Sequence, residues 1–236
     1  MFKNFYKVLI IVLLLLSTTV LAETELELVA PGGGEADLQE NVMKYYADGT
    51  NLVVVNWDNY KLEAQSLEYQ HQKSTLQGIG MVKLIQKEPY RELKSEQVFA
   101  DLNRDYFKAS GSVKIRYDDT TNISGGHLDW ESRTERFNIT GDVVVYFSGW
   151  KMTGEKIEGN MNSGIFTIFG PVQAINKENS MRAGRAIFNR SIEKLTLLEN
   201  PVVINGKNEL SANEIVYDLK TKKVSASGVV KSRMIE

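Results

Sequence analysis

The sequence predicts an all-β fold built from a repeated hairpin, and two observations carry this prediction. One pattern recurs every 29 to 31 residues, and its copies align on Leu62, Leu93, Ile123, Met152, Met181 and Leu210. Apolar and small residues alternate within each copy, as in residues 166–174, and alternation is typical of a strand rather than a helix. Because one hairpin cannot bury its apolar face alone, the copies are expected to stack side by side.

Each copy also contains a glycine inside its second strand pattern. The step reads Gly-x-Val at Gly80, Gly111, Gly141, Gly170 and Gly228, and the fifth copy has Asn200-Pro-Val202 displaced by one residue. Glycine at such a place indicates a bulge, a bend or a close backbone approach. The repeated units are therefore expected to curve.

Polar, turn-forming residues separate the two strand patterns of every copy, for example Ser132-Arg133-Thr134 and Asn162-Ser163-Gly164. These turns predict six hairpin repeats in one domain over residues 40–236. The stretch Val42 to Val55 has the spacing of half a repeat and is expected to form an opening strand or hairpin.

The first 22 residues have the features of a signal peptide. Lys3 and Lys7 precede an apolar run, and Val20-Leu21-Ala22 is typical of a cleavage site. An uncleaved membrane anchor is the alternative, although the apolar run is shorter than the roughly 20 residues that span a bilayer. Residues 23–39, which include Pro31-Gly32-Gly33-Gly34, are expected to form a flexible leader.

Composition fits an exported β domain without disulfides, since the chain contains no cysteine. The 28 basic residues, less Lys3 and Lys7, stand against 30 acidic ones, so the processed chain has a net charge near −4. The charges are interspersed and no basic stripe is visible, which argues against a nucleic-acid partner.

No set of residues in the sequence predicts a catalytic site or a metal site. His71 and His127 lie in different copies, and neither they nor the acidic residues are spaced as a metal site or a catalytic group requires. The acidic residues near strand ends fit solvated faces better than a glycosidase pair. We therefore expect no catalytic residue, no metal and no cofactor, and we expect that the protein is not an enzyme.

Aromatic residues and methionines recur on one side of the repeat, and two interpretations of them are open. They either fill an ordinary core or line an apolar trough between curved sheets that do not close fully. Periodicity does not separate these interpretations, because a filled sandwich and an open groove have the same alternation.

The repeat resembles that of the OstA/LptA family of periplasmic lipopolysaccharide-transport proteins. The resemblance covers roughly residues 62–234 and is clearest in Leu210-Ser-Ala212-Asn-Glu-Ile215-Val-Tyr217, in Ala226-Ser-Gly228-Val-Val230 and in Ile139-Thr-Gly141-Asp-Val-Val144. It implies a taco-like antiparallel β-jellyroll, here of about 12 to 15 strands, with an open apolar groove. The chain departs from the short single-module pattern of the family in having six clear copies.

The resemblance implies that the groove carries the lipid A acyl chains of lipopolysaccharide in the periplasm. The expected lining residues, all from the middle copies, are Leu128, Trp130, Phe137, Met152, Ile157 and Phe166. Expected partners are LptC-like and LptD-like jellyroll domains and, through end-to-end self-association, a second copy of the chain, joined through an edge strand that contains Val229 and Val230. The alternatives are an LptC-like component anchored in the inner membrane and a structural β-solenoid without lipid cargo.

Overall fold

The computed structural model describes residues 26–234, which form antiparallel β-structure with one 3-10 turn, η1 (His71–Lys73), and no α-helix in that range. The strands are β1 (Glu27–Val29), β2 (Gly34–Asp37), β3 (Val42–Tyr46), β4 (Val53–Trp57), β5 (Tyr60–Ala64), β6 (Ser66–Gln70), β7 (Thr75–Gln86), β8 (Arg91–Asp101), β9 (Tyr106–Arg116), β10 (Thr121–Glu131), β11 (Arg136–Phe147), β12 (Trp150–Asn160), β13 (Ile165–Ile175), β14 (Asn179–Asn189), β15 (Lys194–Leu198), β16 (Val202–Asn205), β17 (Asn208–Ser211), β18 (Glu214–Asp218), β19 (Val224–Ser227) and β20 (Lys231–Arg233). The expected signal peptide lies outside the described residues.

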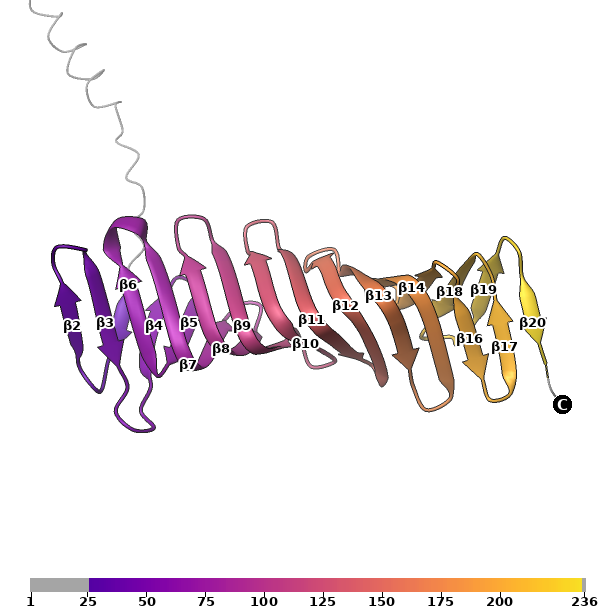
Figure 1. Ribbon diagram of the computed structural model, residues 1–236, viewed down its shortest axis with the longest axis horizontal. Coiled ribbons are helices and arrows are strands. Elements are labelled where there is room, and N and C mark those ends of the chain that lie inside the picture. The colour runs from indigo at the N-terminus through magenta and orange to yellow at the C-terminus, as the bar shows by residue number, and fades with distance from the viewer. Residues whose placement is uncertain (1–25, 235–236) are drawn as a thin grey trace, which may run out of the picture.

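The strands stack in one direction as an elongated array that runs from β2 at one end to β20 at the other (Figure 1). From β7 to β14 each strand pairs antiparallel with the strands before and after it in the chain. Two such strands and their two short connections make one sequence repeat. The repeated polar segments lie where turns were predicted, including residues 132–135 and 161–164.

The long strands bend near their middle, and in β7, β9, β11 and β13 the bend lies at the repeated glycine. The pairing register shifts there, for example between Thr140 and Val143 in the β11–β12 pair. Gly111 and Ser112 adopt positive φ angles of 78° and 48°, a conformation that glycine reaches without steric cost and other residues rarely adopt. The predicted curvature is therefore confirmed, and its cause is a bulge repeated from strand to strand.

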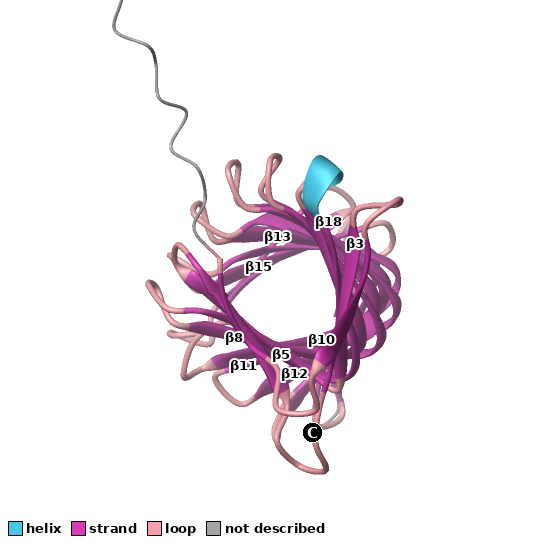
Figure 2. Ribbon diagram, turned by 90° about the vertical axis from the view of Figure 1, so that its left-hand side faces the viewer, coloured by secondary structure: helices cyan, strands magenta, loops and turns pink. Residues whose placement is uncertain are grey.

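The bend divides the sheet into two facing layers. Layer I contains β2, β3, β6, β15, β18, β19 and the halves of the long strands that adjoin the turns at 71–74, 102–105, 132–135, 161–164 and 190–193. Layer II contains β1, β4, β5, β16, β17, β20 and the opposite halves of the same long strands. Viewed along the array, the strands surround its long axis (Figure 2).

Alternating side chains of both layers point inward and form one continuous hydrophobic cluster from Val53 to Tyr217. In β13, for example, Phe166, Ile168 and Val172 are buried, whereas their neighbours in the strand are less so. This arrangement is the antiparallel two-layer fold that the alternation predicted. It is a β-jellyroll in which the bends join the layers along one side.

The ends of the array differ from the sequence-based expectations. Residues 26–234 form 20 strands rather than about 12 to 15, because near both ends the bend interrupts the strands completely, as between β15 and β16. Val42 to Val55 contributes β3 and β4, which pair with different neighbours and do not form a hairpin with each other.

Within the expected flexible leader, residues 27–29 and 34–37 form strands instead. β1 pairs with β4, and β2 pairs with β3. The glycines between them allow the turn, because the N–H of Gly32 donates to the carbonyl of Tyr46 at 2.9 Å and Gly33 has a φ of 81°. The glycine-rich composition therefore marks a bend in the first strands of the array rather than a linker.

The prediction that Val229 and Val230 lie in the final strand is wrong. They connect β19 to β20 after Gly228, which has a φ of 82°, and both are exposed. The N–H of Val229 donates to Asn213 Oδ1 at 2.6 Å. The sixth Gly-x-Val step is thus one more bend, and the free edge belongs to β19 and β20.

Candidate functional site: the interior between the layers

The structure brings the six predicted lining residues together in the interior between the layers. Leu128, Trp130, Phe137, Ile157 and Phe166 point inward from layer I, and Met152 points inward from layer II. Their exposed fractions run from 0% for Met152 to 5% for Trp130. Trp130 stacks on Phe107 with ring centroids 5.2 Å apart, and Phe137 meets Phe166 edge to face at 5.4 Å. These side chains therefore form one apolar surface, which is densely packed in this structure.

The two layers meet a second time on the side opposite the bends, which we call the mouth. Within residues 26–234, no strand pairing joins the layers there. Side chains cross the mouth instead, among them the aromatic pairs Tyr60–Phe107 at 5.1 Å, Tyr117–Phe166 at 6.2 Å, Phe147–Phe188 at 4.8 Å and Trp150–Tyr217 at 5.3 Å between centroids. Ring pairs at these distances contribute roughly 0.5–1.5 kcal/mol each beyond their burial.

The layer II members of these pairs were missed by the sequence analysis. Each of them lies at the end of a strand nearest the mouth. Tyr60 and Trp150 begin their strands, Phe147 ends its strand, and Tyr117 directly follows β9. The repeat comparison emphasised the aromatic positions on the two sides of one turn, such as Trp130 and Phe137, and these positions belong to layer I. A second alignment on the residues that flank the opposite turns would have found them.

A row of polar contacts covers the aromatic pairs at the mouth. Arg91 Nη1 of layer II lies 2.7 Å from Glu135 Oε2 in a layer I turn. The hydroxyl of Tyr117 donates to the carbonyl of Met161, and Asp118 pairs with Arg190. Toward the C-terminal end, Asn179 Nδ2 donates to the Tyr217 hydroxyl at 3.1 Å, and Lys222 Nζ lies 2.8 Å from Glu178 Oε2.

The centre of this row is a stack of two guanidinium groups on one ring. Arg91 and Arg190 both lie 4.8 Å from the centroid of Tyr117. Burial raises the pKa of Asp118, but hydrogen bonds from Thr120 and Thr121 and the charge of Arg190 outweigh it, so the pKa is lowered overall. The carboxylate therefore stays charged and holds Arg190 at the mouth. Opening the mouth here would separate two ion pairs and a cation–π stack.

The interior near this stack holds a cavity of about 20 Å³, lined in part by Leu84, Arg91, Leu128, Trp130 and Met161. Trp130 Nε1 is buried without a hydrogen-bond partner. The cavity can hold about one water molecule, whereas sites for drug-sized ligands measure roughly 300–1,000 Å³. The predicted open groove is thus closed in this structure around the six predicted lining residues. An acyl chain could enter there only if the two layers moved apart.

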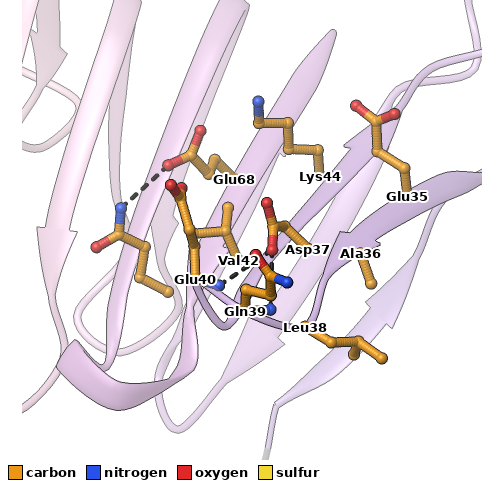
Figure 3. Close-up of a pocket in the computed structure, with 10 residues that line it drawn as sticks. Glu35, Ala36, Asp37, Leu38, Gln39, Glu40, Val42, Lys44 and Glu68 are labelled. Carbon is orange, nitrogen blue, oxygen red and sulfur yellow. Dashed lines mark hydrogen bonds between the residues drawn. The ribbon is translucent and has the colours of Figure 1, made fainter.

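A larger hollow of about 580 Å³ lies at the N-terminal end, between β2, β3 and β6 (Figure 3). Carboxylates dominate its rim, and Asp37 Oδ1 accepts the backbone N–H groups of Gln39 and Glu40 at 2.9 and 3.0 Å. Its lining is polar, so it does not extend the apolar interior. His71 lies in η1, and His127 lies on the outer face of layer I. No group of three or more His, Asp or Glu side chains among the described residues could hold a metal ion.

No family model matches the sequence. No curated protein matches it either. Among solved structures, the chain is similar to LptH from Pseudomonas aeruginosa, described as the LptA-homologous periplasmic component of the lipopolysaccharide transport device. The two share 17% sequence identity and a TM-score of 0.46, over 49% of this chain and 95% of that chain.

None of the described helical segments is long and apolar enough to cross a membrane. The N-terminal apolar run lies outside the described residues.

Proposed function

We propose that this protein binds lipopolysaccharide in the periplasm, with acyl chains between its layers, as part of a bridge between the inner and outer membranes. The observation that supports the proposal most directly is the difference between the two sides of the jellyroll. Backbone ladders continue through the bends on one side, whereas in the described chain only side chains join the layers at the mouth. The layers can therefore separate at the mouth without loss of a strand pairing.

The chemistry of the interior suits an acyl chain. Its lining is aliphatic and aromatic, and separation of the layers would expose Leu128, Phe137, Ile157 and Phe166. Burial of an acyl chain is favourable by roughly 0.8 kcal/mol per CH₂ relative to water, but transfer from another apolar phase is nearly neutral. Such an interior would pass lipid along the array with little energetic cost, and the direction of transport would come from an energy source elsewhere.

Photo-crosslinking in cells tests the proposal. A crosslinking residue at Phe137 or Phe166, both buried, should capture lipopolysaccharide, whereas one at Arg133, in an exposed layer I turn, should not. Equal capture at all three positions would indicate a sticky surface and would contradict the proposal. Mass spectrometry of lipids that copurify with the protein would identify the cargo independently.

A structural β module without cargo is the second candidate, and the small interior cavity favours it. That candidate predicts a permanently closed mouth and no captured lipid at Phe137 or Phe166.

An LptC-like, membrane-anchored role within the same pathway differs in its N-terminus. N-terminal sequencing of the envelope protein distinguishes the exported transport component from the anchored one. Processing before Glu23 fits the exported form, and a retained Met1 or Phe2 fits the anchored form.

A further inference from the structure

The outer faces of the two layers carry different charge. In the fully described stretch from β7 to β14, the outward basic residues of layer II are Lys83, Lys94, Lys114, Arg116, Lys151 and Arg182. Away from the bends its one outward acidic residue is Glu92, and Glu96, Asp142 and Glu155 lie exposed at the bends themselves. On layer I, Lys108, Arg136, Lys156 and Arg185 are balanced by Asp101, Asp129, Glu131 and Glu158. The whole chain has a formal net charge of −2, so the excess on layer II is a property of the fold. We call this outer surface of layer II the basic face.

Most of the positive charge on the basic face is not neutralised. Glu92 is shared between Lys83, at 3.1 Å, and Lys94, at 2.8 Å. Burial raises the pKa of Glu92, but hydrogen bonds from Lys94, Lys83 and Tyr90 outweigh it and hold that pKa at about 2, so the carboxylate cancels one of the two charges. Arg116 pairs with Asp119 of the adjoining turn at 2.6 Å.

Three members of the basic face have no such carboxylate. In the described chain no ion pair involves Lys114, Lys151 or Arg182, and all three are exposed. Their positions span β9, β12 and β14, so the unpaired charge extends across the middle of the array. An excess of this kind attracts an extended anionic surface more than a single small anion.

The basic face also has a shallow hollow and exposed apolar groups. The hollow measures about 470 Å³, and its lining includes Lys94, Lys114, Arg116, Asn122 and Ser124, all of which can donate hydrogen bonds. Tyr90, Tyr146 and Ile175 lie on or beside the same face and are 49%, 50% and 43% exposed. Lysines and arginines interspersed with exposed tyrosine and isoleucine match the interface of a bilayer, where phosphates bind the cations and aromatic rings lie at headgroup level.

We propose that the basic face of layer II docks on the surface of a bilayer that contains anionic phospholipid, with lipid phosphates against Lys94, Lys114 and Arg116. An acidic protein surface would contact the same lysines, but the unpaired charges of Lys114, Lys151 and Arg182 are spread from β9 to β14, which fits the extended phosphate layer of a bilayer better. The balanced outer face of layer I stays in solution. The array would then lie flat on the membrane along its middle strands, with its mouth at one margin of the contact.

Vesicle flotation of the protein purified from the cell envelope tests this inference. The probes are phosphatidylcholine vesicles with and without phosphatidylglycerol, so that binding which does not depend on lipid charge is measured separately. The triple variant Lys114→Gln, Lys151→Gln, Arg182→Gln should weaken binding to anionic vesicles by up to about a hundredfold, since each charge near the surface contributes about fivefold. The matched variant Lys108→Gln, Arg136→Gln, Lys156→Gln removes the same charge from layer I and should bind like the wild type.

A second measurement shows the orientation directly. The chain has no cysteine, so Tyr146→Cys on layer II and Ile165→Cys on layer I can each be labelled with a nitroxide at one site. Only the label at 146 should become protected from a water-soluble relaxation agent when anionic vesicles are added. Equal losses for both triple variants, no preference for anionic vesicles, or face-specific binding to an acidic protein alone would overturn the proposal. No lipopolysaccharide is present in these experiments, so their failure leaves the proposed interior site untouched.

Discussion

Arg91 and Glu135 are 44 residues apart in the chain, belong to different layers, and join their charged groups at 2.7 Å across the mouth. Their side chains are only 9% and 13% exposed. Gln86 Oε1 accepts a further hydrogen bond from Arg91 at 3.2 Å, and Tyr117 lies against the guanidinium group. The pair therefore closes the mouth at a place where water is largely excluded, and an interaction there is stronger than at an exposed site.

Removal of one partner of this pair should destabilise the fold. We expect Glu135→Gln to lower the free energy of unfolding by about 3 kcal/mol, because it leaves the charge of Arg91 buried without a counter-charge. Urea unfolding measures the change. The exposed pair Arg116–Asp119 is the control, and Asp119→Asn should cost at most about 1 kcal/mol. Similar losses for both variants would show that the mouth does not depend on the Arg91–Glu135 pair.

This contact also shows where sequence-based prediction reached its limit. The 29- to 31-residue repeat, the alternation and the Gly-x-Val step predicted the stacked, curved units, because each of these features is local to a few residues. Contacts across the mouth join segments more than one repeat apart, and nothing in the local pattern at Arg91 indicates Glu135 as its partner. The predicted lining residues came together because the alternation placed them on the inner face.

The basic face was missed for a related reason. Along the sequence, Lys114 and Arg116 are followed 15 residues later by Asp129 and Glu131, so the charges look evenly mixed. Folding separates them, because the bend sends the two halves of each strand to different layers, with the two basic residues on layer II and the two acidic residues on layer I. The sorting becomes visible only when the register between distant strands is known.

The ion pairs of Glu92 predict how stability depends on pH. Its pKa of about 2 in the folded protein lies below the ordinary value of 4.5, so the unfolded chain takes up a proton first as the pH falls. The stabilisation is therefore complete above about pH 4.5 and is lost progressively between pH 4.5 and about pH 2. We expect its size to be about 1 kcal/mol, as for other partly exposed ion pairs.

Thermal unfolding between pH 6 and about pH 2.5 checks this expectation. The melting temperature of Glu92→Gln should fall less steeply below pH 4.5 than that of the wild type, because the variant has no carboxylate to protonate at this position. Glu155→Gln changes an exposed residue at a bend and is the control, which should follow the wild-type curve. Parallel curves for wild type and Glu92→Gln would contradict the prediction.

The last prediction concerns the free edges at the two ends of the array. In the described chain β19 pairs only with β18, and at the opposite end β1 pairs only with β4 and β2 only with β3. Unpaired edges of this kind accept a further strand. We therefore expect copies of the chain, or related jellyroll domains, to join end to end.

Proline substitutions at two adjacent positions of β19 distinguish an effect on end-to-end association from an effect on folding. The N–H of Asp218 donates to the carbonyl of Lys223 at 2.9 Å, and N–H directions alternate along an antiparallel strand, so the N–H of Ser225 points toward β18 and that of Ala226 points to the free edge. Ser225→Pro should lower the melting temperature because it removes a ladder hydrogen bond. Ala226→Pro should keep the melting temperature and abolish end-to-end association in analytical ultracentrifugation, since proline at an edge blocks only the added strand. If Ala226→Pro associates as the wild type does, β19 is not the junction.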